Sequence, residues 1–169
     1  MKSATYTAIH TVFVLTAGTV TFVFDFFLPS SPANFVRQSL PFSYLTITTP
    51  ADVQIYSDID DTWTGQSGMT TTAHHTDGAE RLYIMSVRDS WTYGEEADMA
   101  FWGDVVFASR LLHPHDASKL SSALGDHHTV RNEFVKTDVA SSNQINWKNP
   151  GPNGDVVAFS HNFSTVTGT

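Results

Sequence analysis

The sequence predicts an all-β chain folded as an antiparallel β-sandwich, and two observations support this fold class. Short runs alternate between apolar and polar residues, as in a strand with one buried face. Gly, Pro and Asn separate these runs at short intervals, as is typical of sandwiches. With 169 residues, one domain is expected.

The first two predicted strands form a β-hairpin. Residues 9–15 are rich in β-branched side chains, and residues 19–26 alternate strictly, so that four apolar residues share one face. Residues 16–18 form the tight connection, because Gly18 tolerates a positive φ. His10 and Thr11 interrupt the apolar run, so a hairpin is favoured over a secretory signal, and a membrane span is excluded.

Further strands are expected along the rest of the chain. They cover residues 42–48, 53–59, 82–87, 105–108 and 156–159. Turn-forming residues between them lie at 29–32, 41, 49–50, 65–68, 76–78 and 149–154. Only residues 95–102 and 116–124 could hold a helix, of two or three turns each.

Composition limits the classes of partner and of chemistry. The net charge of −8 would repel nucleic acid and anionic membranes. The chain has no cysteine, which excludes disulfides, thiolate nucleophiles and Cys-ligated zinc. No metal and no cofactor are expected.

One short motif has a possible catalytic meaning. Residues 58–62 read DIDDT, the D-x-D-x-T pattern of haloacid-dehalogenase-type phosphatases. In such an enzyme Asp58 would be the nucleophile at the end of a central parallel strand, Asp60 the general acid or base, and carboxylates would share magnesium. The preceding strand alternates instead of being continuously apolar, and the Gly- and Thr-rich segment after it is a poor helix former. The phosphatase is therefore kept as an alternative function.

The same residues also have a purely structural interpretation. In a strand that reaches Ile59, Val53 and Ile55 point inward with it. The other face would then meet solvent or a neighbouring domain; it carries Gln54, Tyr56, Asp58 and Asp60. Asp61 and Thr62 would begin a turn, with Trp63 covering it from the apolar side.

Four long segments together resemble the amino-terminal domain of the fungal glutaminase A family. They are FVRQSLPFSYLTI (35–47), VQIYSDIDDTWTGQSG (53–68), EEADMAFWGDVVFAS (95–109) and GDVVAFSHNFSTVTG (154–168). The resemblance covers almost the whole chain. It implies a β-supersandwich placed before a helical toroid of the six-hairpin type, in a secreted protein. It also implies that glutamine hydrolysis belongs to the toroid, which this chain lacks, and that residues 1–169 are a single partial domain, incomplete at both ends.

This resemblance makes the chain a non-catalytic accessory domain whose partner is the toroid. Five residues are candidates for the contact with it: Tyr56, Asp58, Asp60, Trp63 and Trp102. A carbohydrate-binding module is a second alternative, in which an aromatic platform would stack on sugars. That platform would use Tyr56, Trp63, Trp91, Tyr93 and Trp102.

The remaining polar clusters carry weaker hypotheses. Histidines occur at 74–75, 113 and 115, and 127–128, but adjacent histidines on a strand point to opposite faces, so a metal site is not expected. Glu95, Glu96 and Asp98 are expected to form a solvated acidic turn rather than a pair of glycosidase acids. Asn162 begins a glycosylation sequon, which matters only in the secretory route.

Overall fold

The chain forms two compact units. The structure is a computed structural model, and it describes residues 1–30, 33–49, 52–65, 70–87, 95–96, 99–100, 103–111 and 119–163. The first unit comprises Met1–Val53 with Phe163–Thr169, and the second comprises Gln54–Asn162.

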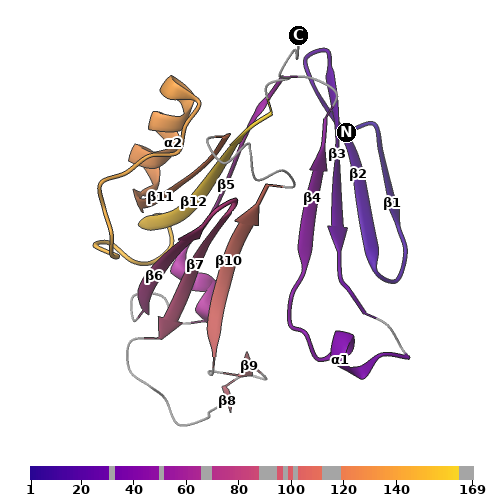
Figure 1. Cartoon of the computed structure of the whole chain (residues 1–169), viewed down its shortest axis with the longest axis horizontal. Helices are drawn as coiled ribbons and strands as arrows, with labels where there is room; N and C mark the ends of the chain where they lie inside the picture. Colours follow the sequence, from indigo (N-terminus) through magenta and orange to yellow (C-terminus); the bar gives the residue numbers. More distant parts are fainter. Residues whose placement is uncertain are drawn as a thin grey trace. The chain divides into compact units, whose positions relative to one another are not determined.

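The first unit is a four-stranded antiparallel sheet in the order β1-β2-β3-β4 (Figure 1). Its strands are β1 (Ser3–Tyr6), β2 (His10–Ala17), β3 (Val20–Phe27) and β4 (Tyr44–Thr48), and a short helix α1 (Phe35–Gln38) precedes β4. The predicted hairpin between β2 and β3 is confirmed, and Gly18 takes the expected positive φ of 57°. β1 was not predicted, because four residues are too few for the alternation of SATY to stand out.

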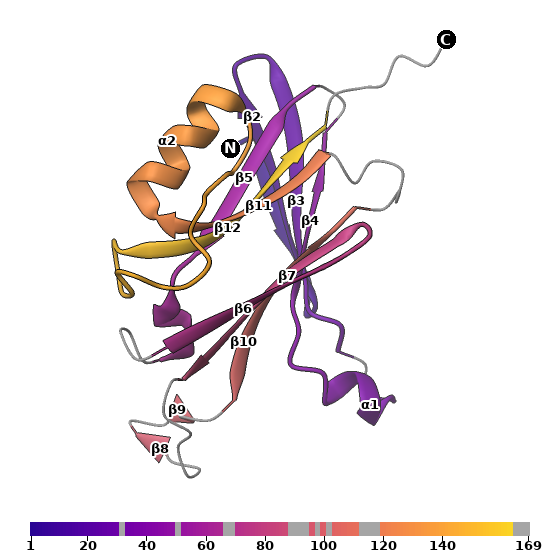
Figure 2. The ribbon, with the colours of Figure 1, turned by 60° about the vertical axis from the view of Figure 1, so that its left-hand side comes forward.

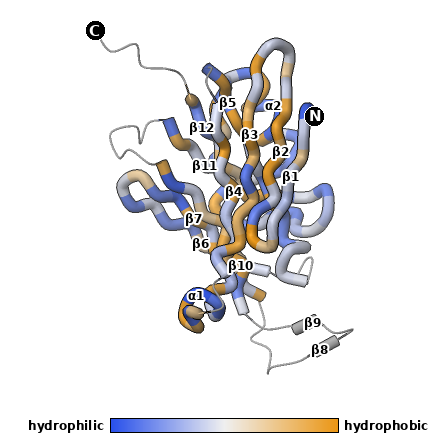
Figure 3. The backbone as a smooth tube through the Cα atoms, turned by 90° about the vertical axis from the view of Figure 1, so that its right-hand side faces the viewer, coloured by the Kyte–Doolittle hydropathy of each residue, from blue (hydrophilic) through white to orange (hydrophobic). Residues whose placement is uncertain are grey.

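One face of this sheet is apolar. Residues directly opposite each other in an antiparallel pair point to the same side, so the register assigns each side chain to a face. The apolar face contains Thr11 and otherwise apolar or aromatic side chains: Ala4, Tyr6, Phe13, Leu15, Ala17, Val20, Phe22, Phe24, Phe26, Leu45 and Ile47. Figure 3 shows the hydrophobic stretches along β2 and β3. The opposite face is mixed: it carries Asp25, His10 and most of the threonines together with Val12, Val14, Val23, Phe27 and Tyr44.

The second unit is a β-sandwich, which confirms the predicted fold class. One antiparallel sheet has the order β10-β7-β6 and the other the order β11-β12-β5. The first contains β6 (Thr70–Asp77), β7 (Glu80–Val87) and β10 (Asp104–Arg110), and the second contains β5 (Gln54–Ile59), β11 (Leu120–Asp126) and β12 (Asp155–Asn162). A 3-10 helix η1 (Asp61–Thr64) follows β5.

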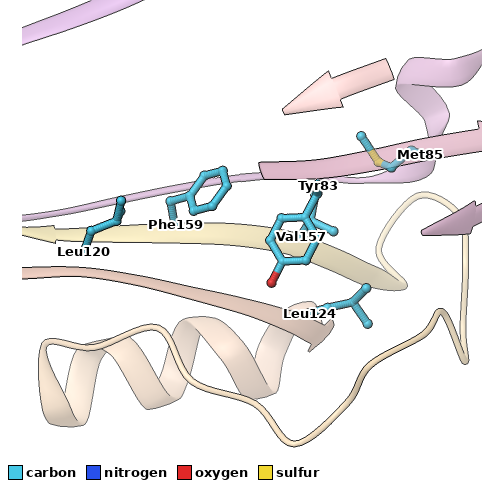
Figure 4. Packing of buried hydrophobic residues seen from close by; sticks show 6 residues of the cluster. All are labelled: Tyr83, Met85, Leu120, Leu124, Val157 and Phe159. Atoms are coloured by element: carbon cyan, nitrogen blue, oxygen red, sulfur yellow. The ribbon is translucent and has the colours of Figure 1, made fainter. Parts of the chain in front are cut away.

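The core lies between these two sheets (Figure 4). Phe159 on β12 is fully buried, and its ring lies 4.8 Å from that of Phe107 and 5.6 Å from that of Tyr83. The other members of the buried cluster come from both sheets: Met85, Leu120, Leu124 and Val157. Burial raises the pKa of Tyr83 to about 12. The continuous apolar run predicted at 156–159 is thus the central strand, buried on both sides.

A helix forms a third layer on the sandwich. α2 (His127–Thr137) lies along the outer face of the β11-β12-β5 sheet (Figure 2). Val130 on the helix packs with Ala123, Ala158 and Tyr56 of that sheet. Small side chains on the sheet allow the helix to come close. At Gly125, a Cβ atom would lie 3.2 Å from a methyl carbon of Val130 on the helix.

Both helical expectations were wrong. Residues 95–102 contain the two-residue strands β8 (Glu95–Glu96) and β9 (Met99–Ala100), which pair with each other. Of residues 116–124 the structure describes 119–124, and residues 120–124 belong to β11, where Leu120, Ala123 and Leu124 are buried. None of the described helices is long and apolar enough to cross a membrane.

Candidate functional site

The DIDDT motif lies where β5 runs into η1, and its first carboxylate is an anchor for helix α2. Asp58 accepts two hydrogen bonds from Arg131 on α2, from Nε at 2.7 Å and from an Nη at 3.0 Å. The Tyr56 hydroxyl donates a third bond to Asp58 at 2.8 Å. This forked geometry is the strong form of an arginine–carboxylate contact. The Asp58 side chain is only 14% exposed.

The surroundings of this cluster change the acidity of its members. Burial, with the Asp58 hydrogen bond second, raises the pKa of Tyr56 well above its ordinary value. The hydrogen bond to Asp58 raises the pKa of Arg131. The Tyr56 ring also packs against Phe134, with 5.1 Å between ring centroids. Tyr56 therefore stays a neutral donor, and the cluster fixes α2 on the sheet.

This arrangement differs from a haloacid-dehalogenase site in its strand topology. β5 is an edge strand, and its only described partner in the sheet is β12, which runs antiparallel. A nucleophilic aspartate of that kind needs the end of a central parallel strand, with helices around the sheet. Asp58 instead lies beneath α2, where Arg131 occupies both of its oxygens. Nothing in this geometry favours the phosphatase.

The other two aspartates of the motif form the turn. Asp60 is the N-cap of η1 and accepts a hydrogen bond from the Thr62 amide at 3.1 Å, as well as one from the Thr62 hydroxyl. Asp61 is fully buried and accepts a bond of 2.9 Å from the hydroxyl of Thr70 on β6. The predicted turn beginning at Asp61 and Thr62 is confirmed. The Asp61 carboxylate connects this turn to β6 of the facing sheet, and the Asp60 carboxylate caps η1.

The candidate contact residues that the structure describes lie in different environments. Tyr56 and Asp58 were expected to meet solvent or another domain, but α2 of the same unit covers them. Trp63 does not cover the turn as predicted, since it is 68% exposed. Trp102 lies outside the described residues, as do Trp91, Tyr93 and Asp98. Within the described part of the chain, the aromatic residues of the motif therefore do not form a platform for sugars.

Two of the histidine pairs lie in the described part of the second unit. His74 on β6 stacks on Tyr83 at 4.6 Å and lies 3.1 Å from the Ser122 hydroxyl. His127 and His128 begin α2, whereas residues 113 and 115 lie outside the described ranges. Among the described residues, no three His, Asp or Glu side chains are placed to hold a metal ion.

A second buried carboxylate orders the loop before β12. Asp155 is fully buried and accepts hydrogen bonds from the backbone amides of Lys148 and Asn149 and from the side chain of Gln144. It therefore stabilises the turn at 149–154 that the sequence predicts. Asn162, the predicted glycosylation residue, is the last residue of β12.

The first unit contains a His–Asp pair beside a shallow pocket. His10 Nδ1 lies 2.9 Å from an Asp25 oxygen, and its ring stacks on Phe27 at 4.5 Å. The pocket, of about 200 Å³, is lined mainly by residues 7–11 and 26–28. A pair of this kind orients an imidazole. Three hydroxyl residues also line the pocket, namely Thr7, Thr11 and Ser43, and the Thr7 hydroxyl oxygen accepts hydrogen bonds from the backbone amides of Ile9 and His10.

Arg131 is the residue that sequence reasoning missed. The motif was read without its partner because the two lie 73 positions apart. A local signal for α2 was present: Asp126 accepts a hydrogen bond from the Thr129 amide at 2.9 Å, as an N-cap does. That bond also lowers the pKa of Asp126.

Comparisons with known proteins agree with the resemblance stated above. The chain is 28% identical over 172 residues to a protein named Glutaminase A from Aspergillus oryzae (strain ATCC 42149 / RIB 40). This match covers 95% of the chain but 24% of the relative, so the chain spans about a quarter of the relative's length. No solved structure matches significantly. The family model described as "Domain of unknown function (DUF5127)" matches residues 9–169. The chain therefore belongs to the DUF5127 family.

Proposed function

We propose that this chain is a non-catalytic accessory domain of a glutaminase A-like hydrolase. The observation that carries the proposal is the alignment, which uses 95% of this chain but only 24% of the relative named Glutaminase A. About three quarters of that relative lies outside the aligned region and is available for the chemistry. In this proposal the two units together form one domain of the supersandwich type, in a secreted fungal protein.

The motif that looked most catalytic supports a structural role. Asp58 fixes α2 through Arg131, Asp60 caps η1, and Asp61 bonds Thr70 on the facing sheet. A nucleophile or general acid must reach a substrate, whereas these three carboxylates are engaged within the fold. The exposed Trp63 beside them is the remaining described candidate for a contact with the toroid.

The first test is turnover by the purified chain. We expect no release of ammonia from glutamine, and no magnesium-dependent hydrolysis of p-nitrophenyl phosphate. The full-length Aspergillus relative, assayed for ammonia release, is the positive control for the glutaminase assay. Glutamine turnover by the chain alone would refute the proposal, and phosphate hydrolysis that Asp58→Asn abolishes would replace it with the phosphatase.

The second test uses the relative. A version of the Aspergillus protein without its aligned region should lose thermal stability while its folded fraction still hydrolyses glutamine. Complete loss of turnover in a folded, monodisperse protein would place catalytic groups inside the aligned region. That result would contradict a non-catalytic role for this family.

A further inference from the structure

The turn before β12 contains the dipeptide Asn153–Gly154, and no other asparagine of the chain is followed by glycine. Such a pair loses the side-chain amide readily, because glycine has no Cβ to hinder attack of its backbone nitrogen on the carboxamide. The Asn153 side chain is exposed and makes no hydrogen bond to the described residues. Only the backbone can therefore protect this carboxamide.

Asn153 occupies the third position of a four-residue turn. The Gly154 N–H donates a hydrogen bond of 2.9 Å to the Gly151 carbonyl, and Asn153 has a positive φ of 63°. Pro152 at the second position and a positive φ at the third are features of a type II turn. The nitrogen that would attack the carboxamide is thus engaged with Gly151 while the turn is closed.

Gly154 also holds the start of α2. Its carbonyl accepts hydrogen bonds from the backbone amide and from Nδ1 of His127, each at 3.0 Å. The first of these bonds satisfies an amide at the helix N-terminus that has no partner within the helix. A Cβ atom at position 154 would lie 1.9 Å from the Asn149 carbonyl oxygen, so only glycine fits. This turn is a second anchor of α2, besides the contact between Asp58 and Arg131.

A buried carboxylate keeps the turn closed. Asp155 follows the dipeptide, is fully buried, and accepts hydrogen bonds from the amides of Lys148 and Asn149 and from the Gln144 side chain. Opening the turn would disturb these bonds as well as the bond between Gly154 and Gly151. Such local opening is rare in a native protein when it breaks buried hydrogen bonds.

We propose that Asn153 is a site of spontaneous deamidation which the closed turn protects, and that its modification loosens the attachment of α2. In the open turn, the Gly154 nitrogen gives its proton to hydroxide and forms a bond to Cγ of Asn153. The carboxamide nitrogen takes a proton from water and leaves as ammonia. Water then opens the resulting succinimide ring at either carbonyl and leaves aspartate or isoaspartate.

Both products place a new negative charge two residues from the buried Asp155. Isoaspartate also adds one methylene to the main chain, at a point where Gly154 lies directly against the Asn149 carbonyl. A longer backbone cannot keep both the bond to Gly151 and the two bonds to His127. The modified chain should therefore have a less stable second unit.

The test is peptide mass spectrometry of the intact chain during incubation in mildly alkaline buffer. Trypsin cuts after Lys148, so the site lies in the peptide 149–169. Conversion of amide to acid at Asn153 should be at least about tenfold slower in the folded chain than in a synthetic peptide of residues 147–157, which has no fixed turn. Equal rates in the chain and the peptide, or no conversion in either, would overturn the proposal.

Two matched variants examine the role of the buried carboxylate. Gln144→Ala removes one hydrogen bond to Asp155 and should speed conversion at Asn153 at least about threefold, because the turn opens more often. The control is Asn143→Ala, at the adjacent exposed position, and it should leave the rate unchanged. Equal rates in the two variants would contradict protection by the closed turn.

The consequence for α2 is measured on the same samples. The tryptophan-monitored urea midpoint of the wild-type chain should fall as conversion proceeds. Asn153→Gly accepts the positive φ but has no carboxamide, so its midpoint should stay constant during the same incubation. An unchanged midpoint in a largely converted wild-type chain would show that the modification does not loosen α2, and would overturn that part of the proposal.

Discussion

The two units of this chain solve the problem of burying apolar surface in different ways. The second unit places two sheets face to face and adds a helix, so that Phe159, Met85 and Val157 lose all contact with solvent. The first unit has one sheet, and none of its described residues is buried. The second unit also carries the whole net charge, whereas the first carries none. One sequence therefore contains a self-sufficient core and a sheet that needs a partner.

The largest difference should appear when a phenylalanine is truncated in each unit. Phe159→Ala removes a ring that packs between Tyr83 and Phe107, and should lower the free energy of unfolding of the second unit by about 3–5 kcal/mol. Phe26→Ala should change that value by less than about 0.5 kcal/mol, because Phe26 belongs to the other unit. Urea titration followed by tryptophan fluorescence measures this, since all the tryptophans lie within residues 54–162.

The same experiment can also show that the two units do not unfold independently. If Phe26→Ala lowers the tryptophan-monitored stability as much as Phe159→Ala does, the two units unfold together. The division into a stable and a dependent unit would then be wrong.

A smaller effect is expected from removing one carboxylate in each unit. Asp58→Asn should cost the second unit about 1–3 kcal/mol, because a largely covered carboxylate loses its forked bond to Arg131. Asp25→Asn should cost the first unit less than about 1 kcal/mol, since solvent screens a pair in which both side chains are about a third exposed. Circular dichroism at increasing urea reports on both units.

A double-mutant cycle identifies the partner of Asp58. We expect the effects of Asp58→Asn and Arg131→Gln to be non-additive by at least about 0.5 kcal/mol. Additive effects would show that the contact does not anchor α2. The interpretation of the DIDDT motif as part of the fold would then lose its main support.

The sequence predicted most strands of both units. It did not predict that a helix covers the outer face of the β11-β12-β5 sheet. Alternation was sufficient where one side of a strand is apolar, as in the hairpin with Gly18. It was insufficient at β5, where both sides are covered: Tyr56 and Asp58 appeared to face solvent because they are polar, yet a distant arginine satisfies them. Only a pairing across 73 positions could have shown this.

The helix expected at residues 116–124, part of which forms β11, was also wrong because of contacts between distant residues. The LSSALGD sequence of β11 contains good helix formers, but pairing with β12 and the need for small residues under α2 override that local preference. α2 was missed because it buries few residues, namely His127 and Val130, so its apolar stripe is narrow. Both failures concern tertiary contacts, although the N-cap residue Asp126 is a local signal for the start of α2.

Acid should weaken the second unit through two histidines, His74 and His161. Burial lowers the pKa of His161, which lies 2.7 Å from the Ser109 hydroxyl of the facing sheet, and of His74. The unfolded chain takes up these protons near the ordinary pKa of 6.5, while the native histidines resist them. The stability contributed by the neutral imidazoles is therefore complete above pH 6.5 and falls as the pH drops toward the lowered native pKa values.

The measurement is the tryptophan-monitored urea midpoint between pH 8 and pH 5. We expect a constant midpoint above about pH 7 and a decrease below pH 6.5. The variant His161→Gln should show a shallower decrease, because one of the resisting groups is gone. A midpoint that rises on acidification would contradict the assigned direction for both histidines.

The smallest effect compares two equivalent turns, one in each unit. Gly18 joins β2 to β3 with a φ of 57°, and Gly78 joins β6 to β7 with a φ of 51°. A Cβ atom at either position would meet no other atom within 4 Å, so Gly→Ala adds only the backbone strain of a left-handed conformation, about 1 kcal/mol. Because the local strain is equal, any difference between the variants reports on the unit that carries the turn.

Gly78→Ala should lower the tryptophan-monitored stability by this amount, and Gly18→Ala should leave it unchanged while shifting the circular dichroism transition. If Gly18→Ala also moves the tryptophan transition, the first sheet does contribute to the stability of the sandwich.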